Sequence, residues 1–270
     1  MFEEKNKIGI GFRKVEENFL IDKKGNTIYQ ETITRTGVAV KTISLLLCVS
    51  LFAWLSYSSF IPSLVSKKPS LIRPILFFSV LLTFGTYLVG VFSVSLSKAC
   101  SWIFAMSKGF TLGALLLFLR SEYIWLSNFN SVISLALIST ILVFAIMLLL
   151  YSNNILVSTF SFQKKMLFCT FIILSFSILS IIFAVLRIPL FEQMQSVWFI
   201  ALPINMFLIV YSSLTLILYF DYVEQMIFNN MTKKYEWQLS LCFVAVIVLF
   251  FIRILKFLLN IFRFSRKDMI

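Results

Sequence analysis

Histidine is absent from this chain of 270 residues, and charged residues make up only 13% of it. Without histidine the chain lacks the commonest metal ligand and general base, which excludes Ser-His-Asp and Cys-His catalytic arrangements. The sequence also contains no G-x-S-x-G motif and no pair of aspartates inside an apolar run. We therefore expect no enzymatic activity, no cofactor and no metal site.

Cysteine is scarce, with four residues that each lie inside an apolar run. No two of them form a C-x-x-C pair, so the spacing predicts neither a zinc site nor a redox motif. Small buried hydrophobic side chains are the expected role. The four are Cys48, Cys100, Cys169 and Cys242.

Apolar residues are in excess: they make up 60% of the chain, phenylalanine alone occurs 31 times, and the mean hydropathy is +0.94. An ordinary soluble domain has roughly half its residues apolar and about a quarter charged. A single water-soluble core of this length could not bury so much apolar surface. Lipid must therefore solvate most of the side chains, and the partner of the chain is the bilayer.

The charge is strongly basic, with 24 Lys and Arg against 12 Asp and Glu, a net charge of +12. In a soluble protein such a balance would suggest nucleic acid as a partner. Here the basic residues fall mostly in short gaps between apolar runs, as the positive-inside bias and contact with anionic lipid require. We therefore expect no nucleic-acid partner.

A membrane-spanning helix needs about 20 mostly apolar residues, and the chain offers seven such stretches. Each is apolar on nearly every side, as expected for helices buried in lipid and in each other. The short alternating segments of a β-barrel are absent. The sequence predicts an all-α membrane protein with seven transmembrane helices, at about 42–61, between Arg73 and Lys98, at 99–119 and 131–151, between Lys165 and Arg187, and at 197–220 and 237–260.

Three regions follow from this pattern. Residues 1–36 form a charged arm without an apolar run long enough for a cleavable signal peptide, and we expect it in the cytoplasm. Residues 37–262 form the seven-helix transmembrane domain, and 263–270 a short basic tail. We expect a multi-pass protein of the cell membrane with its N-terminus in the cytoplasm, because this orientation places more Lys and Arg on the inner side. The basic C-terminal tail, which would then lie outside, argues against this orientation.

Ionisable side chains inside a membrane are functional candidates, because burying their charge in lipid is costly. Lys108 lies midway along the third predicted span, where it is either a functional group or a lysine that is paired or exposed to an internal water pocket. Gly109 and Gly113 follow it with the small-xxx-small spacing that lets two helices approach closely. We interpret these two glycines as helix-packing residues.

Two acidic residues, Asp221 and Glu224, end the sixth span. Three residues apart, they share a helix face, and they predict either a proton or cation site at the mouth of a pore or an ordinary interfacial cap. Glu236 and Arg253 in the seventh helix complete the set of ion- or proton-site candidates. Arg253 lies roughly 25 Å along that helix from Glu236, so we expect it to snorkel or pair near the far interface.

Several motifs occur in an order and spacing that are typical of one family. Thr34–Thr42 resembles T-x-x-G-V-x-x-K-T, and Ala105–Gly113 resembles A-x-x-E-G-x-x-x-G. Met147–Tyr151 matches M-L-x-x-Y, Leu216–Glu224 is similar to L-I-L-D-F-D-x-I-E, and Glu236-Trp237 and Ile254–Lys256 are similar to E-W and I-L-R. With these motifs the chain resembles the Bax inhibitor-1-like family of seven-span membrane proteins, particularly its bacterial branch, from about residue 34 to 260.

The resemblance implies a calcium-leak or proton-sensitive channel activity in which paired carboxylates sense pH. The chain departs from the family pattern at three positions: Lys108 replaces a glutamate, Tyr219 replaces the first aspartate of D-F-D, and Arg253 replaces the acid before I-L-R. The resemblance thus implies a pH-sensitive small-cation (Ca²⁺ or proton) leak. Because a cation pathway lined by Lys108 would repel Ca²⁺, a regulatory remnant of such a leak is the other expected function.

An interaction protein is the alternative function. Some bacterial relatives in this family bind and restrain a membrane-bound protease, and the charged arm of residues 1–36 could supply such a contact. The same charge pattern is typical of a solvated tail. Deletion of residues 1–30 should matter for an interaction protein, whereas Asp221→Asn should matter for a leak.

Overall fold

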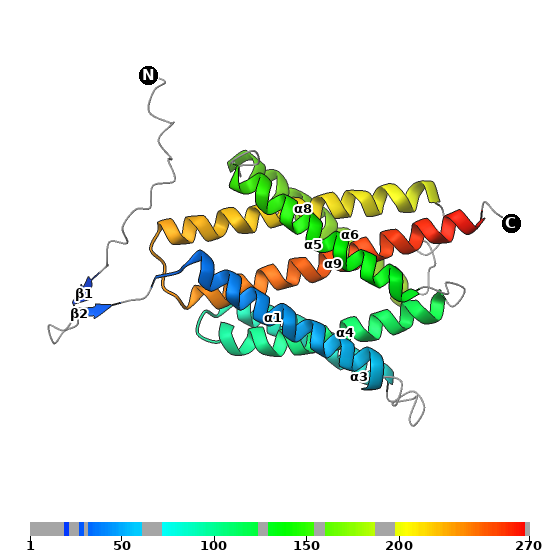
Figure 1. Ribbon diagram of the computed structural model, residues 1–270, viewed down its shortest axis with the longest axis horizontal. Coiled ribbons are helices and arrows are strands. Elements are labelled where there is room, and N and C mark those ends of the chain that lie inside the picture. Colours follow the sequence, from blue (N-terminus) through cyan, green and yellow to red (C-terminus); the bar gives the residue numbers. More distant parts are fainter. Residues whose placement is uncertain are drawn as a thin grey trace, which may run out of the picture.

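The computed structural model describes residues 19–21, 27–29, 32–60, 72–123, 129–153, 160–186 and 198–267. Within these ranges, seven helices are long and apolar enough to cross a membrane, which confirms the predicted all-α membrane fold (Figure 1). They are α1 (Arg35–Leu55), α3 (Ile72–Phe92), α4 (Ser97–Glu122), α5 (Phe129–Ser152), α6 (Phe160–Val185), α8 (Trp198–Phe228) and α9 (Tyr235–Lys267).

Two short elements accompany these helices. A five-residue π-helix, Ser56–Phe60, continues α1. Before α1, the strands β1 (Phe19–Ile21) and β2 (Thr27–Tyr29) pair antiparallel, with Phe19 opposite Tyr29. The charged arm thus contains a small hairpin, whose strands of three residues are too short to appear as apolar runs in the sequence.

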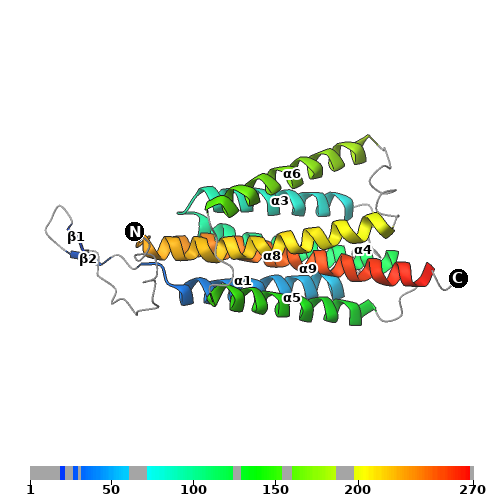
Figure 2. The same cartoon turned by 90° about the horizontal axis from the view of Figure 1, so that it is seen from above.

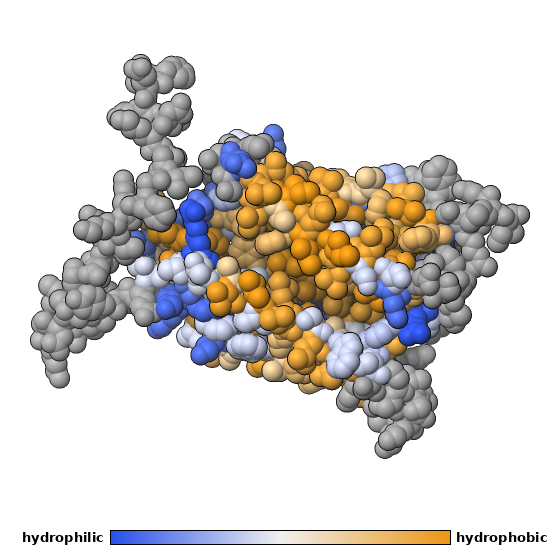
Figure 3. Space-filling view, in the orientation of Figure 1, coloured by the Kyte–Doolittle hydropathy of each residue, from blue (hydrophilic) through white to orange (hydrophobic). Residues whose placement is uncertain are grey.

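The spanning helices alternate in direction, so that the start of α1, the end of α8 and the start of α9 lie together (Figure 1). We call this the N-terminal end of the bundle and the opposite one the far end. On the face shown in Figure 3, apolar residues cover the bundle between these ends, and hydrophilic residues gather near the two ends. Exposed Phe77, Phe78 and Phe168 belong to this lipid-facing apolar surface.

Helix α9 lies at the centre of the bundle and contacts α1, α3, α4, α5 and α8. Its side chains Leu241, Val244, Phe250, Leu255 and Leu259 are almost fully buried. Figure 2 shows α3 and α6 on one side of α8 and α9, with α1 and α5 on the other. The helices α1, α3, α4, α5 and α8 therefore pack around α9, while their outer faces remain apolar for lipid.

Helix α1 begins at Arg35, earlier than the predicted span start at residue 42. Thr34 caps it, because the Thr34 Oγ1 atom accepts a hydrogen bond of 3.0 Å from the Gly37 backbone N–H, and threonine is a favoured N-cap residue. The predicted spans contain only the apolar part of each helix, so they omit polar turns at the helix ends. For this reason α8 continues beyond the predicted end at residue 220 to Phe228, and α9 beyond residue 260 to Lys267.

The turn after α8 is built on a left-handed residue, Asn230, with a φ of 48°. The Met231 N–H bonds to the Met226 carbonyl at 3.1 Å, and the Asn230 N–H bonds to the Ile227 carbonyl at 3.0 Å. These two bonds form a Schellman motif, which ends a helix and reverses the chain. The motif directs the chain back into the bundle at the start of α9.

The segment before α1 is attached to this turn. The Ile33 N–H donates to the Met231 carbonyl at 3.0 Å, and Thr32 forms a bridge with Thr232. The Ile33 side chain is only 2% exposed and packs with Val38 and other buried residues of α8 and α9. Thr34 and the start of α1 are thereby fixed beside the start of α9.

Gly109 and Gly113 lie where α4 crosses α1. A Cβ atom at Gly109 would come within 2.5 Å of the Val49 carbonyl oxygen, and one at Gly113 within 2.5 Å of the Ala53 carbonyl oxygen. These distances are far below van der Waals contact, so only glycine permits this approach. The α1 and α4 backbones lie directly against each other at both positions.

Candidate functional site

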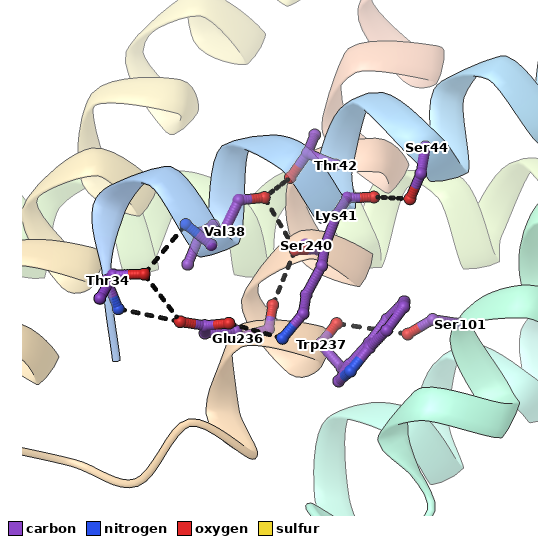
Figure 4. Close-up of polar contacts among 10 residues, drawn as sticks. Thr34, Val38, Lys41, Thr42, Ser44, Ser101, Glu236, Trp237 and Ser240 are labelled. Carbon is purple, nitrogen blue, oxygen red and sulfur yellow. Dashed lines mark hydrogen bonds and ion pairs between the residues drawn. The ribbon is translucent and has the colours of Figure 1, made fainter. Parts of the chain in front are cut away.

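A buried carboxylate, Glu236, joins the starts of α9 and α1 (Figure 4). Its side chain is 0% exposed. The Oε1 atom accepts hydrogen bonds from the Thr34 backbone N–H at 2.9 Å and from Thr34 Oγ1 at 3.1 Å, and Oε2 pairs with Lys41 Nζ at 2.5 Å. The carboxylate therefore stabilises the positive end of the α1 dipole and neutralises a lysine.

Gly37 makes room for this carboxylate. A Cβ atom at position 37 would lie 2.3 Å from Glu236 Oε1 and 2.5 Å from Oε2. Thr34, Gly37 and Lys41 recur at intervals of three and four residues, so they share one face of α1. We call Thr34, Gly37, Lys41 and Glu236 the Glu236 cluster.

Polar and aromatic contacts connect the Glu236 cluster to α4. The Ser240 Oγ atom lies 2.7 Å from the Glu236 carbonyl oxygen and 3.1 Å from that of Val38. Ser101 Oγ on α4 donates to the Trp237 carbonyl at 3.2 Å. The ammonium groups of Lys41 and Lys98 lie 5.0 and 5.8 Å from the centre of a Trp237 ring, within the range of cation–π attraction.

The charges of Glu236 and Lys41 are balanced against each other, and both carboxylate oxygens have partners. This arrangement can fix the two helix ends. The sequence pattern places Glu236 among the ion-site candidates but does not identify Lys41 as its partner. The spacing of Thr34, Gly37 and Lys41 on one helix face was the available signal for a shared partner.

A cavity of about 790 Å³ lies inside the membrane-spanning bundle, between α3, α4, α6, α8 and α9. Its described wall is mostly apolar and carries two charged residues, Lys108 from α4 and Asp221 from α8. Hydroxyl and amide groups add polarity. The polar uncharged lining residues are Thr83, Tyr87, Thr111, Gln163, Thr170, Tyr211, Ser212, Thr215, Tyr219, Tyr222 and Gln225.

Lys108 lies roughly 16 Å along α4 from Ser97, at 1.5 Å per residue. Its side chain lines the cavity and forms no ion pair with any residue in the described part of the chain. The neighbouring Ser107 belongs to a buried hydroxyl group between α3 and α4, in which its Oγ lies 2.7 Å from Thr83 Oγ1 and donates to the Ser79 carbonyl at 2.8 Å.

Asp221 and Glu224 have separate surroundings although they are three residues apart. Asp221 lines the cavity, and its Oδ2 atom accepts hydrogen bonds from Gln163 Nε2 at 3.0 Å and Gln225 Nε2 at 2.7 Å. Glu224 forms an exposed ion pair of 2.8 Å with Arg35 of α1. The structure therefore brings Asp221, and not Glu224, into one cavity with Lys108.

Arg253 lies farther along α9, is partly buried, and is not among the described residues that line this cavity. It forms no ion pair within the ranges that the structure describes. In those same ranges no three His, Cys, Asp or Glu side chains come together as a metal site. Of the five ionisable candidates, only Lys108 and Asp221 share a cavity.

Comparison with known protein families gives a match over most of the chain. The sequence profile of a family described as Bax inhibitor 1 like matches residues 13–263. This range extends from before α1 into the last turns of α9, so it covers every described membrane-spanning helix. No curated protein and no solved structure matches the chain.

Proposed function

The chain belongs to the Bax inhibitor 1 like family, and from this premise we propose that it is a pH-sensitive leak for small cations, Ca²⁺ included, across its membrane. The observation that supports the proposal is the cavity inside the bundle that Lys108 and Asp221 line together. The cavity offers polar groups within the apolar bundle, where burying the charge of an ion without polar partners is costly. Each of the two charged residues has a distinct role in the proposal.

Asp221 is the proposed cation ligand. Both amide hydrogen bonds, from Gln163 and Gln225, end on its Oδ2 atom. Oδ1 accepts no hydrogen bond from the described residues, and carboxylate oxygens are preferred ligands of hard cations. The two amides fix the carboxylate through Oδ2, which leaves Oδ1 for a passing ion in this proposal.

Lys108 is the proposed barrier. The repulsion between its ammonium group and a passing ion grows in proportion to the charge of the ion. A divalent ion is therefore repelled twice as strongly as a monovalent ion at the same distance. We expect a Ca²⁺ leak that is slow in the natural chain and faster when the charge of Lys108 is removed.

The direction of the pH dependence follows from charge alone. Any proton that the cavity gains at lower pH makes it more positive. A more positive cavity repels cations more strongly. We expect a larger cation leak at pH 8 than at pH 6.

The test measures Ca²⁺ and K⁺ flux into proteoliposomes at pH 6 and pH 8, beside empty liposomes. Asp221→Asn should lower both fluxes several-fold, whereas Lys108→Gln should raise Ca²⁺ flux more than K⁺ flux. Glu224→Gln is the matched control, because Glu224 belongs to an exposed ion pair and does not line the cavity. Flux equal to that of empty liposomes from correctly folded protein would contradict the leak.

Modulation of a membrane-bound partner, such as a protease, is a second candidate. It is supported by the β1–β2 hairpin, which lies beyond the ends of the helices in Figure 1, where a soluble domain of a partner could reach it. Deletion of residues 1–30 tests it, because the bridge between Thr32 and Thr232 would still hold the start of α1. Loss of co-purification with a partner, with ion flux unchanged, would support modulation over the leak.

A further inference from the structure

The cavity is accessible from the side of the bundle. Val80, Phe84 and Leu167 line it and are 58%, 63% and 60% exposed. They belong to α3 and α6, which lie on the same side of the central helices in Figure 2. Since this surface faces lipid, a molecule dissolved in the bilayer could enter between these two helices without crossing water.

Two hydroxyl groups that line the cavity with Lys108 donate their hydrogen bonds to backbone carbonyls. Thr111 Oγ1 donates to the Lys108 carbonyl at 2.9 Å, and Thr83 Oγ1 donates to the Ser79 carbonyl at 2.7 Å. The ammonium group of Lys108 has no carboxylate partner among the described residues, Asp221 included. It is therefore a strong donor in a mostly apolar wall, and such a charge is costly to bury without a partner.

We propose that this cavity binds a single-chain amphipathic anion, with its carboxylate at Lys108 Nζ and its hydrocarbon chain along Val80, Phe84, Leu167 and Leu249. Fatty acids are the chemical class that combines these two parts. A volume of about 790 Å³ lies within the range of roughly 300–1,000 Å³ that is usual for small-molecule sites, which are also mostly apolar with a few polar groups.

Charge complementarity selects the headgroup, and the exposed apolar wall selects the chain. An uncharged alcohol of equal length would bury the same chain but leave the ammonium group unpaired. A two-chain anionic phospholipid would offer a charge together with a second chain. Binding requires no ion movement, so this site and the proposed leak can fail independently.

The experiment measures binding of radiolabelled palmitate to the full-length protein in nanodiscs of phosphatidylcholine, after subtraction of binding to empty nanodiscs. Saturable binding of one palmitate per protein is expected. Lys108→Met should weaken it at least tenfold, while Lys108→Arg should retain it. Lys165→Met is the matched control, because Lys165 is an exposed lysine of α6 that does not line the cavity.

Competition identifies the headgroup. Hexadecanol should compete at least tenfold more weakly than unlabelled palmitate, and phosphatidylglycerol should not compete at equal concentration. Equal binding by the Lys108→Met protein, or equal competition by hexadecanol, would show that apolar burial alone drives binding and would overturn the proposal. Equal competition by phosphatidylglycerol would reassign the site to phospholipid. A thermal melt of each variant separates lost binding from lost folding.

Discussion

The pairing of Glu236 with Lys41 shows how an ionised side chain is kept inside this bundle. The Glu236 side chain is 0% exposed and that of Lys41 is 18% exposed. Removing two charges from water costs several kcal/mol per ion, which close pairing and additional hydrogen bonds must offset. Here Thr34 supplies two such bonds to one carboxylate oxygen, while Lys41 takes the other.

Neutralising Glu236 should destabilise the protein strongly. Glu236→Gln leaves the ammonium group of Lys41 mostly buried and without its counter-charge, a change that costs on the order of 3 kcal/mol. The free energy of unfolding, from titration with a denaturing detergent, measures the effect. Glu224→Gln is the control: its ion pair with Arg35 is exposed, and such pairs contribute at most about 1 kcal/mol. Equal losses in the two variants would contradict a special role for Glu236.

At the scale of elements, the close contact between α1 and α4 depends on two positions of α4 that carry no side chain, Gly109 and Gly113. Val49 and Ala53 present backbone oxygens to the positions where Gly109 and Gly113 would carry a Cβ atom. Without a hydrophobic driving force between helices in lipid, such close backbone approach is a main source of association. The two glycines follow Lys108, so the same contact fixes the helix that carries Lys108 to the cavity.

Adding one methyl group at this contact should therefore separate the two helices. Gly109→Ala places a Cβ atom 2.5 Å from the Val49 carbonyl oxygen, and overpacking of this kind costs about 1–3 kcal/mol. A thermal melt monitored by a thiol-reactive dye would show an earlier transition. Gly85→Ala is the control, because a Cβ atom at Gly85 meets nothing within 4 Å and alanine favours helix; it should melt no earlier than the natural chain.

At the scale of the whole molecule, the two ends of the bundle differ in charge. The described basic residues at the N-terminal end are Arg35, Lys41, Lys98, Lys164, Lys165, Lys233 and Lys234, whereas Arg73, Arg120, Arg263, Arg266 and Lys267 lie at the far end. The positive-inside bias places the more basic end in the cytoplasm. The distribution favours the N-terminus inside.

Labelling tests this orientation. In a background without the four native cysteines, Lys234→Cys and Glu122→Cys place one exposed thiol at each end. A membrane-impermeant maleimide added to intact bacterial cells that express each variant should label the Glu122→Cys protein alone, and both after lysis. Labelling of the Lys234→Cys protein in intact cells would contradict the prediction and place the N-terminal end of the bundle outside the cell.

The sequence determined the seven spans and the helical membrane class, because these depend on local properties, namely the length and apolar content of each run. The motif Thr34–Thr42 and the residues Glu236-Trp237 were also visible in the sequence, and so was the family to which they belong. Helix ends were less accurate, since α1 begins at Arg35 by means of a threonine cap and a carboxylate from α9.

Only the tertiary structure decided which polar groups meet. Glu236 and Lys41 are 195 residues apart, Lys108 and Asp221 share a cavity, and Glu224 turns instead to Arg35. Helices that are apolar on nearly every side carry little signal for which face meets protein and which meets lipid. That choice follows from the packing of α9 at the centre of the bundle, and it alone separates a structural ion pair from an ionisable residue that lines a cavity.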